Sequence, residues 1–330
     1  MKKALVTGAA GFIGSHVVRE LLGEGVWVRA MIRPGESTRN LDGLDVEQVS
    51  GDVLDPDAVA SALTGVDTVF HLAAIFSIWM KDWRRIYEVN LQGTRNVLWA
   101  ALKSGVERVV FTSSIAALGV NPSRELSSED TPFNQYTLGN HYVLTKYLSQ
   151  QEALGFANNG LDLVVVNPCF PFGPNDSVPT PTGQVIVDIL KGISRASFNG
   201  GLNIVDVRDV ARGHVLAALR GRTGTCYILG NRNIEMGEFV ALVCRLAGFG
   251  DRKIVNVPVP VMKAGTAVLK WFSDHVTHRP PLSSPSEIAY ASQYLFFDNT
   301  KARTELGLEF RPVEDSLKES IAWFRDNGYA

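Results

Sequence analysis

The sequence predicts a doubly wound α/β fold, in which helices cover both faces of a parallel sheet. Short strands that are apolar throughout alternate with helical stretches over the first two-thirds of the chain. This pattern is typical of parallel strands buried on both faces. A glycine-rich turn joins the first strand to the first helix. The length of 330 residues is enough for one large core or for two domains that share a boundary.

The elements follow in order along the chain. The first strand, residues 3–7, is rich in β-forming residues, and the first helix, residues 12–25, shows helical periodicity and ends at a glycine. Further helices are expected near residues 56–64, 82–104 and 136–158. Further strands are expected at residues 26–32, 46–52, 67–74, 108–114, 161–168 and 225–230.

The composition excludes several classes of protein. Hydrophobic residues make up 45% and charged residues 20% of the chain, as in an ordinary soluble globular protein. The net charge of -2 favours neither nucleic acid nor an anionic membrane. Cys169, Cys226 and Cys244 lie far apart, so neither a disulfide framework nor a metal site is expected. No apolar run is long enough to span a membrane, and no cleavage site follows the N-terminal stretch, so we expect a cytoplasmic protein.

The glycine-rich turn reads VTGAAGFIG and places Gly8, Gly11 and Gly14 between a strand and a helix. The spacing is G-x-x-G-x-x-G rather than the G-x-G-x-x-G of the common dinucleotide-binding motif, but the glycines would play the same role in both. Glycines allow the backbone to approach a pyrophosphate, whose charge meets the helix N-terminus. A glycine-rich turn without a ligand is the alternative, which the position directly after the first strand disfavours. Phe12 and Ile13 of the same turn are expected to contact the cofactor.

The end of the second strand bears on the choice of coenzyme. In sites that prefer NAD, an acidic residue at this point binds the ribose 2′-hydroxyl. Here Arg33 occupies the position and Arg39 follows. Because a guanidinium binds a 2′-phosphate through forked, charge-assisted hydrogen bonds, we expect NADP(H) to be preferred, with NAD(H) as the alternative. Two solvated loop arginines are the alternative explanation of the pattern.

Residues that follow the third and fourth strands are expected near the adenine and the ribose. His71 ends the fourth strand, and we expect it to pack or to cap rather than to bind metal. The expected cofactor contacts in this region are Asp52, Val53, Leu72, Ala73 and Ala74.

The amino-acid composition of the chain changes after Pro168, where a loop rich in proline and glycine leaves the sheet. Beyond residue 230 the chain is mostly helical. We therefore expect a smaller, discontinuous, mostly helical substrate domain at the carboxyl ends of the strands. The dinucleotide-binding domain would comprise residues 1–168 and 204–230, and the substrate domain residues 169–203 and 231–330.

Tyr142 lies four residues before Lys146, so on a helix the two side chains share one face. Chance on a solvated helix also explains this spacing. However, the strand at 108–114 ends with Ser113 and Ser114 at the carboxyl edge of the sheet, where a serine could join them. Hydride transfer to a carbonyl needs a proton donor at its oxygen, and tyrosine, with a pKa near 10, is a weak one at pH 7.

A lysine cation could tune this tyrosine. At ~4 Å and an effective dielectric of ~20, it would favour the phenolate by roughly 4 kcal/mol, or about three pKa units. We therefore expect Lys146 to lower the pKa of Tyr142, and Ser114 to orient the substrate oxygen.

Several motifs together resemble a known family. They are TGAAGFIG, GDVLDPD, HLAA, FTSSIAALG, YVLTK, NPCFPFGP, VDVRDVARGH and FDNTKARTELGLEFRP. In this order they resemble an extended short-chain dehydrogenase/reductase over essentially the whole chain. Within that superfamily the chain is most similar to dihydroflavonol-4-reductase-like proteins, especially the bacterial group named hopanoid-associated sugar epimerases.

The resemblance implies a catalytic set of Ser114, Tyr142 and Lys146, with Lys146 also holding the nicotinamide ribose. Ser113 remains an alternative to Ser114. The resemblance further places the three glycines at the pyrophosphate and the segment from Pro168 to Phe170 beside the nicotinamide. Asn90 matches an asparagine of the family's dimer-side helix, where helix packing is at least as good an interpretation as catalysis.

Members of this family often form dimers by pairing the helices expected at 82–104 and 136–158, so we expect a homodimer. Apolar side chains on these helices could extend beyond what the sheet covers. These are Val89, Val97, Leu98, Ala101, Leu144 and Leu148.

The substrate wall is expected in residues 75–83, 170–183 and 259–272. Its apolar candidates are Ile78, Trp79, Val178, Trp271 and Phe272, and plain core packing is the alternative for the aromatic residues. Cys169 is interpreted as a small packing residue.

Three functions are compatible with these residues. The first is an NADP(H)-dependent oxidoreductase that transfers hydride between the nicotinamide and a small carbonyl or alcohol substrate, with Tyr142 as acid/base. The second is an epimerase or dehydratase of a nucleotide sugar that retains its NAD. The third is a redox-sensing binding protein, which the intact Ser114, Tyr142 and Lys146 disfavour.

Overall fold

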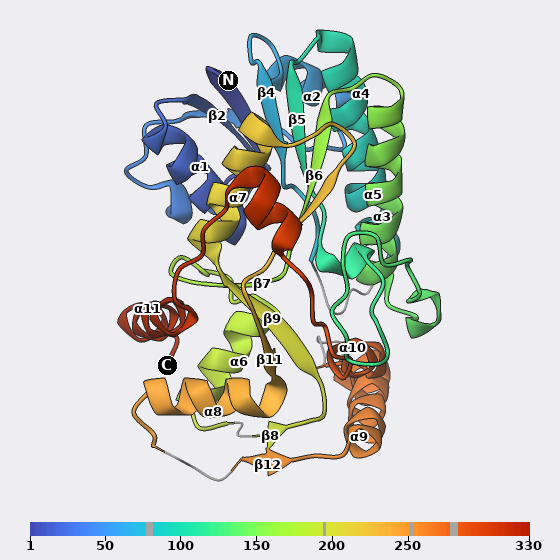
Figure 1. Cartoon of the computed structure of the whole chain (residues 1–330), viewed down its shortest axis with the longest axis vertical. Coiled ribbons are helices and arrows are strands. Elements are labelled where there is room, and N and C mark those ends of the chain that lie inside the picture. Colours follow the sequence, from blue (N-terminus) through green and yellow to red (C-terminus); the bar gives the residue numbers. More distant parts are fainter. Residues whose placement is uncertain (77–81, 194–195, 251–253, 278–282) are drawn as a thin grey trace.

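The structure is a computed structural model that describes residues 1–76, 82–193, 196–250, 254–277 and 283–330. Within these residues the largest sheet has seven strands in the order β10-β6-β5-β4-β1-β2-β3, and every neighbouring pair is parallel (Figure 1). This is the predicted doubly wound, Rossmann-type sheet. The strands are β1 (Lys3–Thr7), β2 (Trp27–Ile32), β3 (Glu47–Ser50), β4 (Thr68–His71), β5 (Arg108–Thr112), β6 (Leu163–Pro168) and β10 (Cys226–Leu229).

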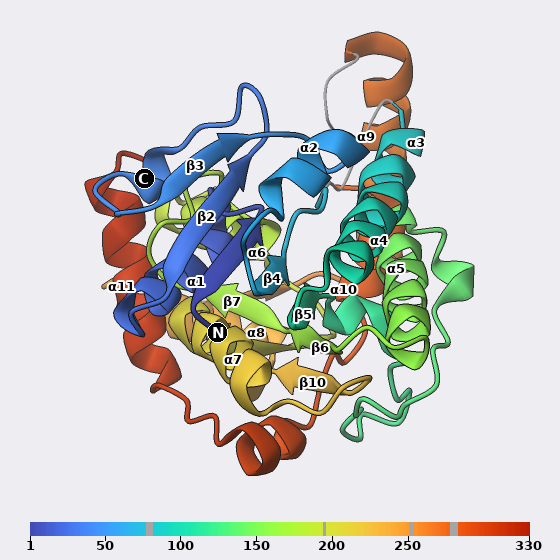
Figure 2. The ribbon, with the colours of Figure 1, turned by 90° about the horizontal axis from the view of Figure 1, so that it is seen from above.

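Helices cover both faces of this sheet (Figure 2). On one face, α1 (Phe12–Gly23) packs against α7 (Val207–Arg220); on the other lie α2 (Pro56–Ala62), α4 (Thr94–Ser104) and α5 (His141–Asn158). Successive side chains of a strand point to opposite faces of the sheet, and each face is covered by a hydrophobic core. The strands therefore read as continuous apolar runs, as the sequence pattern predicted.

The stretch predicted as one helix at 82–104 is built from three pieces. α3 (Arg84–Tyr87) leads into a π-helical turn at Glu88–Gly93, and α4 follows. The expectation that apolar side chains of this stretch extend beyond the sheet is wrong for four of them, because the helices press them into the core. The buried residues are Val89, Val97, Leu98 and Ala101. Leu144 and Leu148 on α5 are half-buried.

A second part of the molecule lies below the carboxyl ends of the strands (Figure 1). It is mostly helical, as predicted, but it also contains a three-stranded sheet in the order β11-β9-β7 and the short pair β12-β8. The strands are β7 (Phe170–Phe172), β8 (Ala196–Ser197), β9 (Gly201–Asp206), β11 (Arg232–Glu235) and β12 (Val255–Asn256). The helices are α6 (Pro181–Leu190), α8 (Met236–Leu246), α9 (Val259–Phe272), α10 (Pro285–Ala291) and α11 (Val313–Asp326).

The two parts are joined by continuous elements. The predicted domain boundary at residue 204 falls inside β9, and the division into two domains stays a prediction. After α10 the chain returns to the large sheet, where Leu295, Phe297 and Leu306 join the core formed with α1 and α7. Short 3-10 helices lie at Arg39–Leu41, Ile115–Ala117 and Tyr136–Leu138, and π-helical turns at Ser273–Thr277 and Ala302–Leu306.

Side chains that accept hydrogen bonds begin several of these helices. Asn140 accepts from the backbone N–H of Val143 at 3.2 Å and so starts α5 two residues before Tyr142. Asp206 caps α7 in the same way, accepting from the N–H of Arg208 at 2.7 Å. In the described part of the chain, no helix is both long and apolar enough to cross a membrane.

Candidate active site

The glycine-rich turn lies at the point where β1 pairs with β2 on one side and β4 on the other. Gly8 has a left-handed φ of 69°, and a Cβ there would lie 2.9 Å from the backbone nitrogen of Ala73. A Cβ at Gly14 would lie 2.0 Å from the carbonyl oxygen of Gly8. Among the described residues no side chain caps α1, whose N-cap is Gly11. The residues present therefore fit a dinucleotide whose pyrophosphate needs close contact with backbone.

Phe12 and Ile13 form the first two positions of α1, directly after this turn. His16 stands one turn further along the same helix. Its Nε2 pairs with the carbonyl oxygen of Pro174 at 2.9 Å, and burial lowers its pKa to about 4. A neutral imidazole donates one hydrogen bond, so His16 ties the start of α1 to the loop that follows β7.

The end of β2 carries both arginines expected at the ribose. Arg33 is exposed, and its guanidinium makes no hydrogen bond or ion pair within the described residues. Arg39 donates to the side-chain oxygen of Asn327 at 2.6 Å. The sequence analysis missed Glu36, whose carboxylate accepts from the backbone N–H of Arg33 at 3.3 Å. An acid therefore stands four residues after the end of β2, and its place three residues after Arg33 in the sequence was the available signal.

The remaining cofactor candidates lie at the carboxyl ends of β3 and β4. Asp52 accepts from the N–H of Leu54 at 3.0 Å and lies 3.5 Å from the guanidinium of Arg85. Val53 is buried. The N–H groups of Leu72 and Ala73 both donate to the hydroxyl of Thr7 at 3.2 Å, and Ala74 follows them directly. These contacts hold the segment after β4 against the glycine-rich turn.

The structure brings Ser114 and Tyr142 together. Ser114 follows β5, and its hydroxyl accepts from the N–H of Ala116 at 3.1 Å. It lies close enough to the Tyr142 side chain to oppose the rise in the pKa of that phenol. Lys146 is buried one turn along α5 and donates from Nζ to the carbonyl oxygen of Thr112 at 3.1 Å. Ser113 does not join this group: its Oγ is buried and has no partner in the described part of the chain.

The pKa values differ from the expectation based on the sequence. Burial raises the pKa of Tyr142 to about 12, and the hydrogen bond with Ser114 opposes this rise. Burial lowers the pKa of Lys146 to about 8. The expected lowering of the Tyr142 pKa by Lys146 is therefore absent from this structure. Lys146 donates to the end of β5, and desolvation of the phenolate dominates at the tyrosine.

Two aromatic side chains that the sequence analysis did not select flank Tyr142. The ring of Phe76 lies edge-on to that of Tyr142, with centroids 4.5 Å apart at 79°. Tyr290 of α10 lies close enough to Tyr142 and Cys169 that their charges, after burial, raise its pKa. Phe76 belonged to the predicted substrate wall. Tyr290 is far away in the sequence, and no local pattern pointed to it.

A buried hydrogen-bond network around His71 joins β1, β4 and α4. His71 pairs through Nδ1 with the Thr7 hydroxyl at 2.7 Å and through Nε2 with the Thr94 hydroxyl at 3.1 Å. Burial, reinforced by the Lys146 charge, lowers its pKa to about 3. His71 is thus a neutral packing residue. Within the described residues no cluster of His, Cys, Asp and Glu could hold a metal ion.

Asn90 lies in the π-helical turn and joins two elements. Its amide oxygen accepts from the N–H of Ile75 at 2.7 Å, while its amide nitrogen donates to the carbonyl oxygen of Ile75 at 3.1 Å and to the hydroxyl of Thr145 at 3.2 Å. Both amide atoms are thus used to hold the segment after β4 against α5. This arrangement agrees with the structural interpretation of Asn90.

The segment beside the expected nicotinamide position is rigidly packed. Pro168 ends β6, and Phe170 begins β7 half-buried between two cores. Cys169 is buried between them, and burial raises the pKa of its thiol. A Cβ on Gly230 would lie 2.4 Å from its Sγ. A thiol with a raised pKa is a weak nucleophile, as expected for a packing residue.

The predicted substrate wall is only partly described. Ile78 and Trp79 lie outside the described residues. Val178 is 83% exposed, and Trp271 and Phe272 on α9 are about half exposed, at 56% and 49%. Core packing is therefore not the role of these two aromatic residues, and none of the three is enclosed.

Comparison with known proteins gives one matching family model, the NAD-dependent epimerase/dehydratase family, over residues 4–230. The chain is 38% identical over 332 aligned positions to a putative dihydroflavonol 4-reductase of Synechocystis, covering 98% of this chain and 95% of the relative. It is 34% identical to sterol demethylase protein B of Methylococcus capsulatus, with 98% of both chains covered. It is 32% identical to cinnamoyl-CoA reductase 2 of Arabidopsis thaliana, covering 99% and 94%.

The fold has close counterparts among solved structures. The crystal structure of gox2253 superposes with a TM-score of 0.88 at 38% identity, covering 100% of this chain and 99% of that one. The likeness extends over both parts of the molecule, including the second part below the sheet.

Proposed function

The chain belongs to the NAD-dependent epimerase/dehydratase family and is an NAD(P)-dependent oxidoreductase of the extended short-chain type, and from this premise we propose that it reduces a ketone or aldehyde. Tyr142 is the proposed proton donor. The resemblance to a putative dihydroflavonol 4-reductase and to a cinnamoyl-CoA reductase supports a reductase.

The observation that carries this proposal is the closeness of the Ser114 and Tyr142 side chains, through which Ser114 opposes the rise in the Tyr142 pKa. Two hydroxyls in contact can both donate to one carbonyl oxygen, which holds that oxygen in place. When bound, the nicotinamide supplies the hydride that reaches the carbonyl carbon. Tyr142 then gives its proton to the oxygen as the carbonyl π bond breaks, and the product is the alcohol. A positioned acid of this kind typically contributes about 100- to 10,000-fold.

Lys146 supports the tyrosine in this proposal. With a pKa of about 8, its side chain is mostly protonated at pH 7. Its Nζ donates to the carbonyl oxygen of Thr112 at 3.1 Å, so in this proposal it positions the strand end that carries Ser114 beside Tyr142. We assign Lys146 a second role, holding the nicotinamide ribose, on the strength of the family resemblance.

We propose that NADP(H) is the preferred coenzyme. The exposed guanidinium of Arg33 at the end of β2 is free to bind a 2′-phosphate. The Glu36 carboxylate, which accepts from the backbone N–H of Arg33, would favour NAD(H) instead. It would repel a 2′-phosphate and accept a hydrogen bond from a 2′-hydroxyl.

Glu36 favours a second candidate, a nucleotide-sugar epimerase or dehydratase that retains NAD. Such an enzyme returns the hydride to the substrate it came from, and the matching family model carries this name. An exchangeable NADPH argues for the reductase, and a tightly retained NAD for the epimerase.

The deciding experiment is a panel of ketones and aldehydes monitored by NADPH absorbance, together with analysis of nucleotide released from the purified protein. Oxidation of NADPH that depends on the carbonyl supports the reductase. Copurified NAD with no external turnover, combined with epimerisation of a nucleotide sugar, overturns it.

We further propose a homodimer formed by α4 and α5. Trp99 on α4 is 52% exposed and lies edge-on to Phe156 of α5, with ring centroids 5.1 Å apart. Phe156 is half-buried, and an exposed aromatic residue such as Trp99 is typical of interfaces. We also propose a cytoplasmic location, which the three free cysteines support.

A further inference from the structure

Asn167 is a polar residue on a buried face of β6, one position before the strand ends. Leu163 and Val165 of the same strand belong to the core formed with α4 and α5, and the two-residue period of a strand places Asn167 on that face. Its exposed fraction is 0%, and its Oδ1 has no hydrogen-bond partner among the described residues. A buried acceptor without a partner is costly, and a leucine would avoid that cost. Core packing alone therefore does not explain this asparagine.

The amide of Asn167 continues the pairing of β5 with β6 beyond the point where the backbone can do so. The N–H of Ser113 donates to the carbonyl oxygen of Val166 at 2.9 Å. Pro168 has no N–H, so it cannot donate the next hydrogen bond between the two strands. Instead, Nδ2 of Asn167 donates to the carbonyl oxygen of Ser114 at 2.8 Å. Because a carbonyl can only accept, this bond fixes which way the amide faces.

The same nitrogen joins Ser114 to α5. Nδ2 of Asn167 also donates to Oε1 of Gln150 at 2.7 Å, and Gln150 is only 3% exposed. Along α5, Tyr142, Lys146 and Gln150 follow one another at intervals of four residues, so their side chains lie on one face of the helix. A single amide therefore connects the backbone that carries Ser114 with the helix that carries Tyr142.

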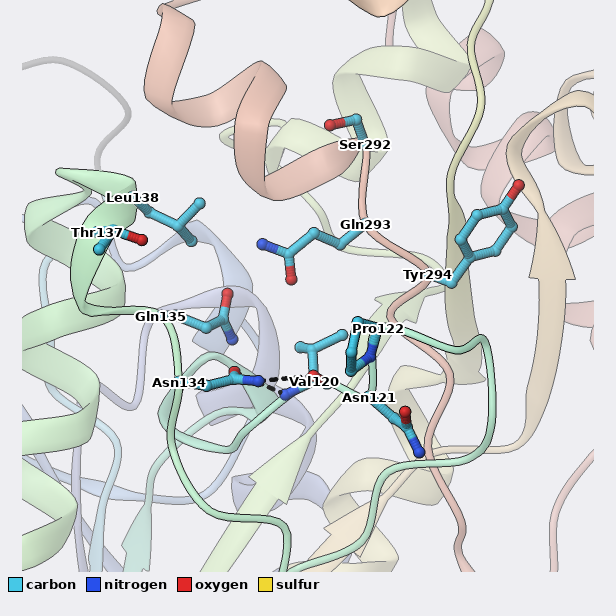
Figure 3. A pocket seen from close by; sticks show the side chains of 10 residues that line it. All are labelled: Val120, Asn121, Pro122, Asn134, Gln135, Thr137, Leu138, Ser292, Gln293 and Tyr294. Carbon is cyan, nitrogen blue, oxygen red and sulfur yellow. Dashed lines mark hydrogen bonds between the residues drawn. The ribbon is translucent and has the colours of Figure 1, made fainter.

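The loop that follows Ser114 is held together by bonds of its own. Asn134 accepts from the N–H of Val120 at 3.1 Å and donates to the carbonyl oxygen of the same residue at 2.8 Å (Figure 3). These bonds lie within the loop, whereas the bond from Asn167 ties Ser114 to the sheet and to α5. Without the Asn167 amide, the loop would keep its shape and Ser114 would be free to shift relative to Tyr142.

We propose that Asn167 is a positioning residue for carbonyl reduction, which holds the Ser114 hydroxyl where Ser114 and Tyr142 can both donate to the substrate oxygen. The Ser114 hydroxyl accepts from the N–H of Ala116 at 3.1 Å, so its own proton is left to donate. Asn167 itself has no exposed surface and acts through Ser114. This inference rests on the reductase function proposed above.

The first test uses NADPH and benzaldehyde as probes. Asn167→Leu replaces the amide with methyl groups on the same branched skeleton. It should lower kcat by about 10- to 100-fold, because a misplacement of about 1 Å can cost up to about 100-fold, while the KM for NADPH changes little. Asn299→Leu is the matched control. It removes a bond of the same kind, from Nδ2 to the carbonyl oxygen of Gly230 at 2.7 Å, and should keep the wild-type kcat. A wild-type kcat in Asn167→Leu overturns the proposal.

A double-mutant cycle tests whether Asn167 acts through Ser114. Ser114→Ala removes the hydroxyl that the amide positions. In that background, Asn167→Leu should lower kcat by no more than about twofold, because residues that act through one another are not additive. The full loss in that background would show that Asn167 acts elsewhere, and it overturns the proposal.

Gln150→Met keeps the test decisive if Asn167→Leu does not fold. It breaks the connection to α5 and leaves the bond from Asn167 to Ser114 in place, so kcat should fall by less than in Asn167→Leu. A wild-type kcat in Gln150→Met overturns the connection to α5.

A spectroscopic measurement separates this inference from the reductase proposal, because it needs no turnover. The NMR resonance of Tyr142 Cζ, assigned in tyrosine-labelled protein by its loss in Tyr142→Phe, reports on the groups around the phenol. It should move in Asn167→Leu in the same direction as in Ser114→Ala, and stay in place in Asn299→Leu. This pattern supports the proposal even if no carbonyl compound is reduced. A resonance that stays in place in Asn167→Leu overturns it.

Discussion

The ammonium of Lys146 donates a hydrogen bond to the carbonyl oxygen of Thr112 at 3.1 Å, which joins α5 to the end of β5. The bond holds a buried cation at Thr112, the last residue of β5, two residues before Ser114. It also explains why the pKa of Tyr142 is raised: Lys146 makes its hydrogen bond to the strand, and burial is the main influence on the phenol. The same geometry leads to two predictions about the chemistry.

The first prediction concerns the proton donor. Tyr142→Phe removes the hydroxyl and keeps the ring against Phe76. We expect turnover in carbonyl reduction to fall at least about 100-fold, the lower limit for a positioned acid. Coenzyme affinity, measured by fluorescence titration, should change little. Near-normal turnover would show that another group supplies the proton.

The second prediction concerns pH. Reduction needs Tyr142 protonated and Lys146 charged, and their pKa values are about 12 and about 8. Lys146 therefore loses its charge first as the pH rises, and kcat/KM for reduction should be level near pH 6–7 and fall above about pH 8. Lys146→Arg keeps a cation at higher pH, so its profile should stay level to a higher pH, at reduced activity. A wild-type profile that is flat to pH 10 would contradict the assignment.

The third prediction concerns the coenzyme. A forked, charge-assisted hydrogen bond is worth roughly 1.5–3 kcal/mol, which corresponds to about a ten- to hundredfold preference for NADPH in kcat/KM. Arg33→Asp should abolish or reverse this preference, and high salt should narrow it. Glu36→Gln removes the opposing carboxylate and should strengthen it. Equal use of both coenzymes by all three proteins would leave Arg33 without a role and favour the enzyme that retains NAD.

The fourth prediction concerns the glycine-rich turn. Gly14→Ala would place a Cβ 2.0 Å from the Gly8 carbonyl oxygen, so the turn must shift. We expect at least about tenfold weaker coenzyme binding and a loss of about 1–3 kcal/mol in the free energy of unfolding. Gly23, in the same helix, has no atom within 4 Å of an added Cβ. Gly23→Ala should therefore be neutral, or stabilising by about 0.5–1 kcal/mol. Similar effects of both changes on coenzyme binding would argue against close backbone contact at Gly14.

The fifth prediction concerns assembly. Light scattering at micromolar concentration should give twice the 36.0 kDa chain mass. Trp99→Lys places a charge at the proposed interface on α4 and should shift the protein toward the monomer. Trp27→Lys, at an exposed position on β2, is the matched control and should remain dimeric. A monomeric wild type would refute the proposed dimer.

The features that could be predicted from the sequence are those that depend on near neighbours in the chain. The side chains of each central strand alternate between a core above the sheet and a core below it, so the whole strand is apolar. The positions of β1, β5 and β6 could therefore be predicted from the sequence. The glycine spacing at Gly8, Gly11 and Gly14 reflects steric limits within a single turn. The four-residue spacing of Tyr142 and Lys146 reflects helix geometry. Each of these is a local constraint that the sequence contains in full.

The tertiary structure decided which distant side chains meet. Phe76 and Tyr290 lie near Tyr142 because separate segments converge at one edge of the sheet, and no local pattern in the sequence records that convergence. The sign of the Tyr142 pKa shift was also beyond the sequence. A four-residue spacing tells how far apart two side chains lie along a helix, whereas the pKa depends on how completely each is desolvated and on which atom each hydrogen-bonds. Those quantities exist only once the whole chain has packed.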